Sequence, residues 1–350
     1  MILTVTLNPA IDVTYYVDAL VRRSGLRVTR VLERSGGKGV NVARVAAACA
    51  ADVTATGLTG GRRGQQLRAD VAEAGIHEEF CQIKGETRQT VNIVETGRPG
   101  LPTELREPGP PVSQAEWDHF RKRFTSLAAE ADVVTMSGSL PPGVPADAYA
   151  TLTALTRSAS AAKVIVDTGG EPLRLACAAG PDLVKPNEAE LLGATATDGP
   201  TRLDRVLAGA AGLRDLGAAA VVVSLGHSGS VAVTPDGRWR ASHSAIPGGN
   251  PVGAGDALVA GLALSAVNGR AVGGRAVGRW AVGSWAADSR EDESWSAGNW
   301  AAGHWPQALR QASGLAMASV LAASAGEVDP AAARRFAEHV RIREIRGAGA

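Results

Sequence analysis

The stretch of sequence that decides the fold reads GGNPVGAGDALVAGLALS, residues 248–265. Small residues, Gly253, Ala254 and Gly255, lead directly into Asp256, and an apolar stretch with the composition of a buried helix follows. Backbone N–H groups at the start of a helix lack intrahelical partners and can bind negative charge. Asp256 is therefore either a helix cap or a residue that accepts a proton, and a cap alone has no need of the small residues before it.

Outward from this stretch, short β-branched segments alternate with Ala- and Leu-rich helical patterns. The predicted strands are 2–7, 52–58, 131–138, 163–168, 182–185 and 219–226, and the predicted helices are 40–50, 64–75, 114–131, 146–160, 202–217, 307–326 and 329–340. Several strands are apolar throughout, which is typical of a parallel sheet covered on both faces. The alternation predicts an α/β fold with a doubly wound sheet and ligands bound beyond the carboxyl ends of its strands.

Two segments depart from this alternation, IDVTYYVDAL (11–20) and TRQTVNIVET (87–96). In both, polar and apolar residues alternate, as in strands with one face exposed. They predict either a small separate sheet that forms a lid over the site or an edge hairpin of the main sheet. We expect the lid strands to come from about 11–34 and 87–107.

A five-residue repeat occupies residues 269–308 and reads GRAVG GRAVG RWAVG SWAAD SREDE SWSAG NWAAG HWPQA. Five of the seven Trp residues of the chain fall in it, at Trp280, Trp285, Trp295, Trp300 and Trp305. A period of five matches neither a helix nor a strand. We expect a mobile insertion over about 269–306 without a packed role, and a contact surface for a partner is the alternative.

Composition narrows the class of protein. The formal net charge of +1 and the absence of a basic stripe argue against nucleic-acid binding. The length of 350 residues fits one large domain over residues 1–350. Polar residues interrupt the apolar stretches, and the N-terminus has the pattern of a strand, so neither a membrane span nor a signal peptide is expected. Cys49, Cys81 and Cys177 lack metal or disulfide spacing, which predicts a cytoplasmic protein with reduced thiols.

Three further motifs carry candidate binding residues. In SGGKGVNVARVAAACA (35–50), flexible backbone at Gly36, Gly37 and Gly39 precedes a helix and can approach an anion or sugar oxygens closely. It is not a Walker A loop, because Gly39 follows Lys38 where Ser or Thr is required. The alternative is an ordinary strand-to-helix turn.

In LVKPNEAELLG (183–193), Asn187 and Glu190 are three residues apart at a helix start. The pair is either a capping box or a polar pair that holds Mg²⁺ through water. In VVVSLGHSGSVAV (221–233), Gly226 and Gly229 form a turn against which a base or ribose could lie, although hairpins have the same pattern. His227, in that turn, is expected to be a solvated residue.

These segments, in this order, resemble the signatures of the ribokinase-like carbohydrate kinases, the PfkB family. GGKGVNVARVAA (36–47) resembles the first signature of the family, NPVGAGDALVAG (250–261) the second, and KPNEAE (185–190) its Asn-x-x-Glu motif. TLNPAIDVTYYV (6–17) and SGSLPPGVP (137–145) resemble the branch of 1-phosphofructokinase and tagatose-6-phosphate kinase. The resemblance implies a three-layer α/β/α sandwich with a small β lid.

The resemblance also implies a role for each motif residue. The implied general base is Asp256, and the implied anion hole consists of Gly253, Ala254, Gly255 and Asp256. The substrate-binding set is Asp12, Gly36, Gly37, Asn41 and Arg88, with Arg27 and Lys38 as further candidates for the substrate phosphate. The nucleotide-binding set is Asn187, Ser224, Gly226, Gly229 and Ser324, and Asn187 and Glu190 organise Mg²⁺, through water. ATP is the expected phosphate donor.

This sequence departs from the branch at three places. Thr90 and Asn92 stand where an Asn and a Lys are usual, so a cation beside the substrate phosphate is missing. Ala257 replaces the usual Ser after GAGD, and Ser324 replaces an Asn near the adenine. The loss at 92 leaves open which phosphosugar is bound, and whether the substrate is phosphorylated at all.

The expected function is an ATP- and Mg²⁺-dependent kinase of a ketohexose phosphate, first of all fructose 1-phosphate to fructose 1,6-bisphosphate. The alternatives within kinases are tagatose 6-phosphate, an unphosphorylated sugar or a nucleoside. A sugar- or nucleotide-binding regulator is the non-enzyme alternative, but it would have no need of Asp256. A homodimer through the lid strands is what the family suggests.

Overall fold

The computed structural model describes residues 1–97, 102–195, 199–244, 246, 249–267, 300, 303–322 and 324–346. In this part of the chain, eleven strands form the main sheet, in the order β15-β14-β13-β12-β11-β10-β9-β1-β4-β5, with β6 beside β4. Their bounds are β1 Ile2–Thr6, β4 Val53–Gly60, β5 His77–Glu78, β6 Cys81–Ile83, β9 Val133–Ser137, β10 Lys163–Asp167, β11 Leu183–Val184, β12 Val221–Ser224, β13 Ser230–Thr234, β14 Gly237–Ser242 and β15 Arg341–Glu344. Strands β4, β1, β9, β10, β11 and β12 are parallel, and β13 to β15 continue the sheet antiparallel.

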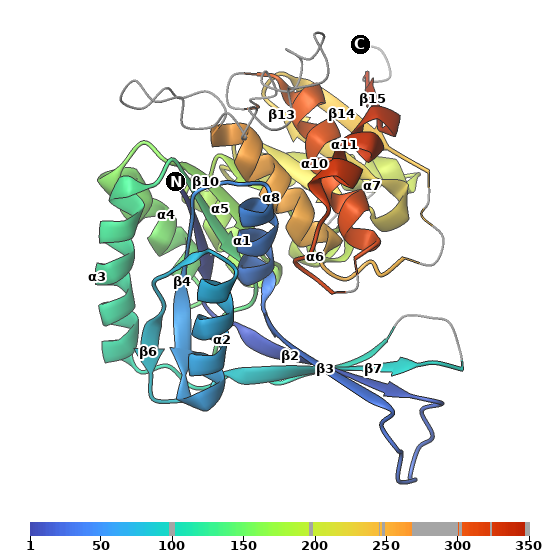
Figure 1. The fold of residues 1–350 in the computed structure, drawn as a ribbon. Coiled ribbons are helices and arrows are strands. Elements are labelled where there is room, and N and C mark those ends of the chain that lie inside the picture. Colours follow the sequence, from blue (N-terminus) through green and yellow to red (C-terminus); the bar gives the residue numbers. More distant parts are fainter. Residues whose placement is uncertain are drawn as a thin grey trace.

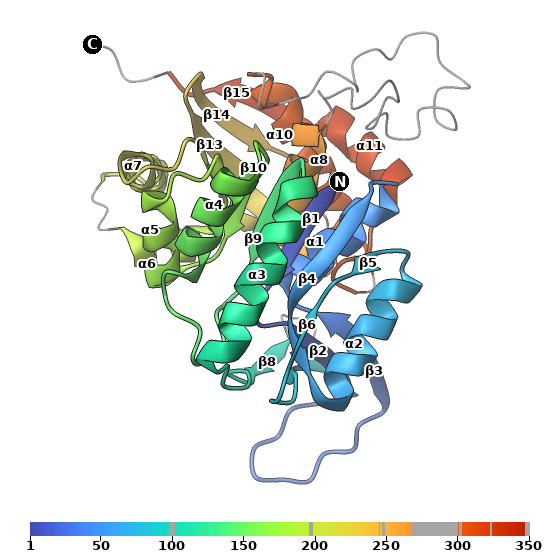
Figure 2. The same ribbon diagram turned by 90° about the vertical axis from the view of Figure 1, so that its left-hand side faces the viewer.

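Helices cover both faces of this sheet (Figures 1 and 2). One layer holds α1 Lys38–Ala48, α2 Gly61–Glu73, α8 Ala254–Val267, α10 Trp305–Val320 and α11 Pro330–His339, and the other holds α3 Gln114–Glu130, α4 Ala148–Ala159, α5 Gly170–Ala178, α6 Glu188–Ala194 and α7 Arg202–Asp215. Successive residues of β1 belong to different cores, Ile2 to one and Leu3 to the other, because strand side chains alternate between faces. The predicted α/β fold with a mostly parallel, doubly wound sheet is confirmed.

The helix that carries Asp256 is buried on all sides. Every residue of α8 from Asp256 to Ser265 is buried, and the helix packs against α1 and α10. Burying a side chain such as Leu258 or Leu262 contributes about 1.5–3 kcal/mol. Because protein surrounds α8 along most of its length, its first turn is held in a fixed place.

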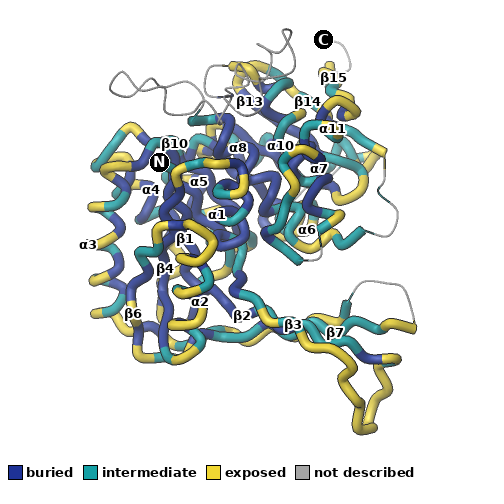
Figure 3. The backbone as a smooth tube through the Cα atoms, viewed as in Figure 1, coloured by how far each residue is buried: buried dark blue, intermediate teal, exposed yellow. Residues whose placement is uncertain are grey.

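The two alternating segments form a separate four-stranded sheet, ordered β3-β2-β7-β8. It consists of β2 Ala10–Val17, β3 Arg30–Gly36, β7 Arg88–Glu95 and β8 Thr103–Arg106. The alternative of an edge hairpin of the main sheet is therefore wrong. This sheet, here called the lid, extends away from the body of the molecule (Figure 1), and most of its residues are exposed or half-buried (Figure 3).

The Trp-rich repeat lies largely outside the described residues. Trp300 and Trp305 are described, and both are buried in the core beside α8. Their rings lie 5.3 Å apart, and the indole N–H of Trp300 donates to the carbonyl oxygen of Leu262 at 2.7 Å. The expectation that the repeat has no packed role is wrong for these two residues, because α10 begins inside the repeat, at Trp305.

The structure also bears on two predictions about helices. The predicted helix 307–326 is shorter at its C-terminal end, because α10 ends at Val320 and Ser324 lies in the turn that follows. No helix in the described ranges is long and apolar enough to cross a membrane.

Candidate functional site

The turn before α8 explains the small residues of the GAGD segment. Gly253 has φ +87°, and a Cβ at this position would come within 2.8 Å of the side chain of Ala325. Helix α8 begins at Ala254, so Asp256 is its third residue and not its cap. The cap interpretation of Asp256 is wrong, and the glycine is required by a close approach of two backbone segments.

The first turn of α8 has free backbone donors. The N–H of Ala254 donates to the carbonyl oxygen of Pro251 at 3.2 Å. Those of Gly255 and Asp256 have no acceptor within the part of the chain that the structure describes. Two unpaired amides at the positive end of a helix form a small site for an anion.

Asp256 is a buried carboxylate that accepts a side-chain hydrogen bond from one residue in the described part of the chain. Its exposed fraction is 7%, and the side-chain amide of Asn41 donates to its Oδ2 at 2.8 Å. Burial raises the pKa of Asp256 to about 7, the charge of Asp167 adds to this rise, and Lys38 and Asn41 oppose it. A carboxyl group with a pKa near neutrality can accept a proton at physiological pH and release it again.

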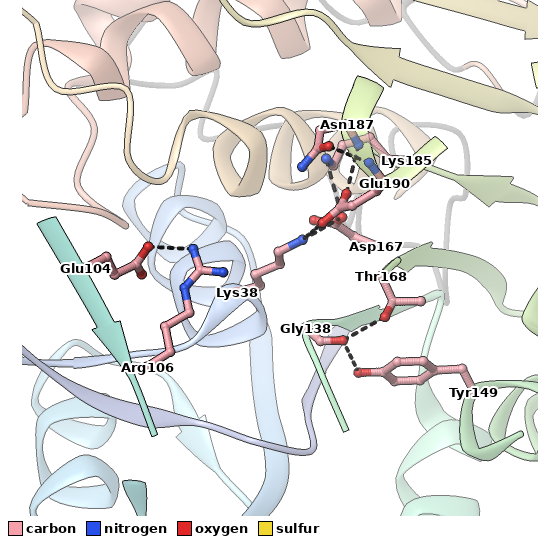
Figure 4. A network of polar contacts seen from close by, with 10 residues as sticks. All are labelled: Lys38, Glu104, Arg106, Gly138, Tyr149, Asp167, Thr168, Lys185, Asn187 and Glu190. Atoms are coloured by element: carbon pink, nitrogen blue, oxygen red, sulfur yellow. Dashed lines mark hydrogen bonds and ion pairs between the residues drawn. The ribbon is translucent and has the colours of Figure 1, made fainter. Parts of the chain in front are cut away.

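Two lysines and two carboxylates form a cluster where α1 and α6 meet the carboxyl ends of β10 and β11 (Figure 4). The charges of three of its members, Asp167, Lys38 and Lys185, act on Asp256. Lys38 Nζ lies 3.2 Å from Asp167 Oδ1 and 2.9 Å from Glu190 Oε1. Lys185 Nζ lies 3.4 Å from the same oxygen of Asp167, which is fully buried. Burial lowers the pKa of Lys38, but the carboxylates raise it more, so this pKa lies above its usual value.

This cluster bears on two predictions. Lys38 was a candidate for the substrate phosphate, but its ammonium group contacts the carboxylates of Asp167 and Glu190. Lys185 was missed, although its Nζ would lie 3.5 Å from a Cβ placed on Gly255. Lys185 therefore brings a cation to the GAGD turn, in addition to the charge of Lys38 that acts on Asp256. The KPNEAE motif (185–190) contains Lys185, but the motif predicted roles only for Asn187 and Glu190.

Asn187 and Glu190 form a complete capping box. The N–H of Glu190 donates to Asn187 Oδ1, and the N–H of Asn187 donates to Glu190 Oε2, both at 2.8 Å. The capping interpretation is thus confirmed for this pair. The Asn187 side chain remains exposed, and the second carboxylate oxygen of Glu190, Oε1, accepts a hydrogen bond from Lys38 Nζ.

A divalent cation is compatible with these residues only through water. No group of three or more His, Cys, Asp or Glu side chains that could hold a metal occurs among the described residues. Asp167 Oδ2, however, is a buried oxygen without a hydrogen-bond partner in the described chain. Together with the Asn187 and Glu190 oxygens it gives the oxygen-rich surroundings that a hydrated Mg²⁺ requires.

The predicted nucleotide-binding residues lie at the same edge of the sheet, with one exception. Ser224 forms an isolated parallel bridge with Asn187, which brings the ends of β11 and β12 together. Gly226 has open space around its α-carbon, whereas a Cβ on Gly229 would lie 2.1 Å from the carbonyl oxygen of Ala241. Gly229 is therefore required by the hairpin itself, and His227 is exposed as expected.

Ser324 comes from the other side of the site. It lies in the turn that precedes Gly326, and a Cβ on Gly326 would come within 3.0 Å of Asn41 Oδ1. The same turn contacts Gly253 through Ala325. Ser324 thus belongs to the loop that backs the Asn41 and Asp256 pair, and not to the end of α10.

The predicted sugar-binding residues converge where the lid joins the body. A Cβ on Gly36 would lie 1.9 Å from Asp12 Oδ2, so the carboxylate of Asp12 lies directly against this glycine. Burial raises the pKa of Asp12 to about 6, against a hydrogen bond with Thr90 and the charge of Arg88. Gly37, with φ +105°, precedes α1, which carries Asn41 on a buried face.

Arg88 lies at the same junction, but Arg27 does not. Arg88 begins β7, opposite Ala10 of β2, and its guanidinium donates to the carbonyl oxygens of Asn8 and Glu107 at 3.1 and 3.2 Å. Arg27 is exposed in the loop between β2 and β3. This loop lies at the end of the lid remote from the main sheet (Figure 1). The structure does not bring Arg27 to the site within one chain.

Known proteins resemble this chain over nearly its whole length. The family model described as pfkB family carbohydrate kinase matches residues 5–332. A putative phosphofructokinase from Staphylococcus aureus is 26% identical, with 99% of this chain and 100% of that chain covered and a TM-score of 0.71. Phosphofructokinase-2 from Escherichia coli in complex with fructose-6-phosphate is 25% identical, with 96% and 98% covered and a TM-score of 0.75.

A further solved structure supports the fold alone. It is a possible 1-phosphofructokinase from Thermotoga maritima, 24% identical, with 99% of this chain and 100% of that chain covered and a TM-score of 0.78. The family match covers most of the chain and includes all the motifs that form the site. The chain therefore belongs to the pfkB family of carbohydrate kinases.

Proposed function

We propose that this protein transfers the γ-phosphoryl group of ATP to a hydroxyl group of a ketohexose phosphate, with fructose 1-phosphate as the first candidate and fructose 1,6-bisphosphate as its product. One observation carries the proposal. A buried carboxylate with a pKa near neutrality, Asp256, is next to two unpaired amides at the start of a helix. A proton acceptor beside an anion site is what phosphoryl transfer to an alcohol requires.

In this mechanism the sugar hydroxyl gives its proton to a carboxylate oxygen of Asp256 while its oxygen forms a bond to the γ-phosphorus. The bond from that phosphorus to the bridging oxygen of ATP breaks, and ADP leaves with the electron pair. The amides of Gly255 and Asp256 and the ammonium group of Lys185 stabilise the charge that develops on the transferred group. Asn41 holds Asp256 in place through its hydrogen bond.

Mg²⁺ would be held through water by Asn187 and Glu190, near the unpaired oxygen of Asp167. When bound, it would neutralise charge on the phosphates of ATP. Ser224 and Gly226, on the same edge of the sheet, would lie along the nucleotide, with Ser324 on the opposite side.

The substrate class rests on the junction between the lid and the body. Asp12 and the backbone at Gly36 and Gly37 offer acceptors and donors for sugar hydroxyls. Arg88 offers a cation within the same junction, which suits a phosphate already on the substrate. The relative from E. coli, 25% identical, is a phosphofructokinase bound to fructose-6-phosphate, and this supports a ketohexose phosphate.

The experiment is ADP release, measured with ATP and Mg²⁺ against fructose 1-phosphate, fructose 6-phosphate, tagatose 6-phosphate, fructose and ribose. We expect saturation with one phosphosugar and none with its unphosphorylated parent. Turnover with tagatose 6-phosphate alone would replace the first candidate with that sugar. Turnover with free sugars alone, or with none of the panel while ATP still binds, would contradict the proposed substrate class.

A further inference from the structure

A cavity of about 490 Å³ lies where the C-terminal ends of α1 and α2 meet the segment that joins α10 to α11. None of the residues assigned above to the sugar, the nucleotide or the proton transfer lines it. Small apolar side chains, among them Ala47, Ala74 and Val328, form part of its wall, and Arg44 and Glu327 are among its charged residues. Cavities of roughly 300–1,000 Å³ hold small organic ligands, so this one is large enough for a second ligand.

The guanidinium group of Arg44 lines this cavity with donors to spare. Its Nε is buried and has no hydrogen-bond partner in the described part of the chain. Its Nη2 reaches the carbonyl oxygen of Asp70 at 3.5 Å, which is long for a hydrogen bond. Burial lowers the pKa of Arg44, and the nearby charge of Arg34 adds to this effect. A half-buried cation with unused donors is unfavourable unless an acceptor occupies the space beside it.

The other charged residues of the cavity already have partners. Arg34 forms an ion pair with Glu327. Asp329 caps α11 through its side chain and lies 3.9 Å from Arg335. One positive charge, on Arg44, is therefore left for one negative charge of a ligand. The carboxylates of Glu327 and Asp329 would repel a second negative charge, which favours a monoanion over a dianion such as phosphate.

The cavity shares two structural elements with the catalytic site. Asn41 and Arg44 are three residues apart on α1, so they lie on one face of the helix. A Cβ on Gly326 would lie 3.0 Å from Asn41 Oδ1 and 3.3 Å from Arg44 Cδ. Asn41 in turn donates to Asp256. A ligand bound at Arg44 would therefore contact the helix and the turn that position the proton acceptor.

We propose that this cavity binds a small organic monocarboxylate, whose carboxylate oxygens accept hydrogen bonds from Arg44 while its hydrocarbon part lies against the alanine residues of the wall. The planar fork of a guanidinium matches the geometry of a carboxylate, and the apolar wall suits a short chain or a ring. This site goes beyond the proposed function, because binding here requires neither sugar nor ATP.

The test is a calorimetric titration of the protein, without sugar or ATP, with butyrate, hexanoate and benzoate. The corresponding amides and inorganic phosphate, at the same ionic strength, are the ligand controls. We expect saturable binding of at least one carboxylate, and none of its amide or of phosphate. Arg44→Gln should weaken this binding by roughly tenfold or more, since it removes a charged hydrogen-bond donor. Ala48→Leu should also weaken it, because it fills the cavity and keeps every charge. Ala178→Leu, at the end of α5 in the other helix layer, is the matched control and should bind as the wild type does.

Two further measurements test the charge and the place of the site. Glu327→Gln removes a repelling carboxylate and frees Arg34, so it should tighten carboxylate binding and allow phosphate to bind. With a carboxylate bound to the wild type, the backbone amides of Gly326 and Glu327 should exchange their hydrogens more slowly.

The inference would be overturned by a wild type that binds none of the three acids, or binds acids and amides alike. Undiminished binding in Ala48→Leu would overturn it even if Arg44→Gln failed to fold. Saturable binding with unchanged hydrogen exchange at residues 326–327 would place the ligand elsewhere and also overturn it. None of these results depends on which sugar the protein phosphorylates.

Discussion

The edge of the main sheet and the lid contrast in how they hold charged groups. At the sheet edge, Asp167, Lys185 and Asp256 are buried, and their partners come from β10, β11, α1 and α8. On the lid, Arg106 and Glu104 come from one strand and are both accessible. Charges fixed in a buried place act strongly on each other, whereas those in water are screened.

Because of this difference, we assign the chemical step to the sheet edge and the choice of substrate to the lid. The sheet edge can shift the pKa of a carboxyl group and hold donors still, as the chemical step requires. The lid, with half-buried strands and exposed ion pairs, can change its side chains without disturbing the core, which suits the choice of substrate. Substitutions in the first region should therefore change kcat, and those in the second should change KM.

The largest expected effect is in Asp256→Asn. Without the proton acceptor, kcat should fall by roughly 10²–10⁴ while the KM for the sugar changes little. Steady-state kinetics with the preferred sugar would measure this. Asp236→Asn, in the exposed turn before β14, is the matched control and should keep its activity. Near-wild-type turnover of Asp256→Asn would contradict the division between the two regions.

A second variant tests the junction between the regions. In Gly36→Ala the new Cβ would lie 1.9 Å from Asp12 Oδ2, so the carboxylate must leave its place. We expect the KM for the sugar to rise by about 10–100-fold, with a smaller loss of kcat, because misplaced groups weaken binding first. Gly25→Ala, in the lid loop with nothing within 4 Å, is the control. An unchanged KM would show that Asp12 does not bind the sugar.

The lid itself is tested by Arg88→Ala. Loss of this guanidinium should raise the KM for a phosphosugar by roughly tenfold, with kcat largely retained. The KM for an unphosphorylated sugar should not change. Equal effects on both sugars would mean that Arg88 supports the lid through its bonds to Asn8 and Glu107 and does not contact phosphate.

The smallest effect is a change in pH dependence. The negative charge of Asp167 raises the pKa of Asp256, after burial as the main cause. In Asp167→Asn that charge is lost, and Lys185 and Lys38 lose a partner, so the pKa of Asp256 should fall. The acid limb of the pH profile of kcat/KM should then move to lower pH, even if the maximal value of kcat/KM also changes. A shift to higher pH would contradict the electrostatic account of the sheet edge.

Much of the molecule could be predicted from sequence because its signals are local. The buried strands and the helix after Asp256 have patterns that the packing confirms. Asp167 and Lys185 were not predicted as site residues, because each is a single residue at the end of a strand. They become neighbours only because β10 and β11 lie side by side in the sheet. Trp300 and Trp305 were wrongly expected to lack a packed role, because a five-residue period gives no sign that they are buried in the core beside α8.

The most direct test of the central claim is the pH dependence of kcat/KM for the wild-type protein and for Asp256→Asn, with the same phosphosugar. The account predicts that the wild-type value rises with pH up to about 7, where Asp256 becomes ionised, and then levels off. The variant should lack this limb and keep only the titration of the substrate phosphate, whose pKa is about 6. The same limb in both proteins would show that another group accepts the proton.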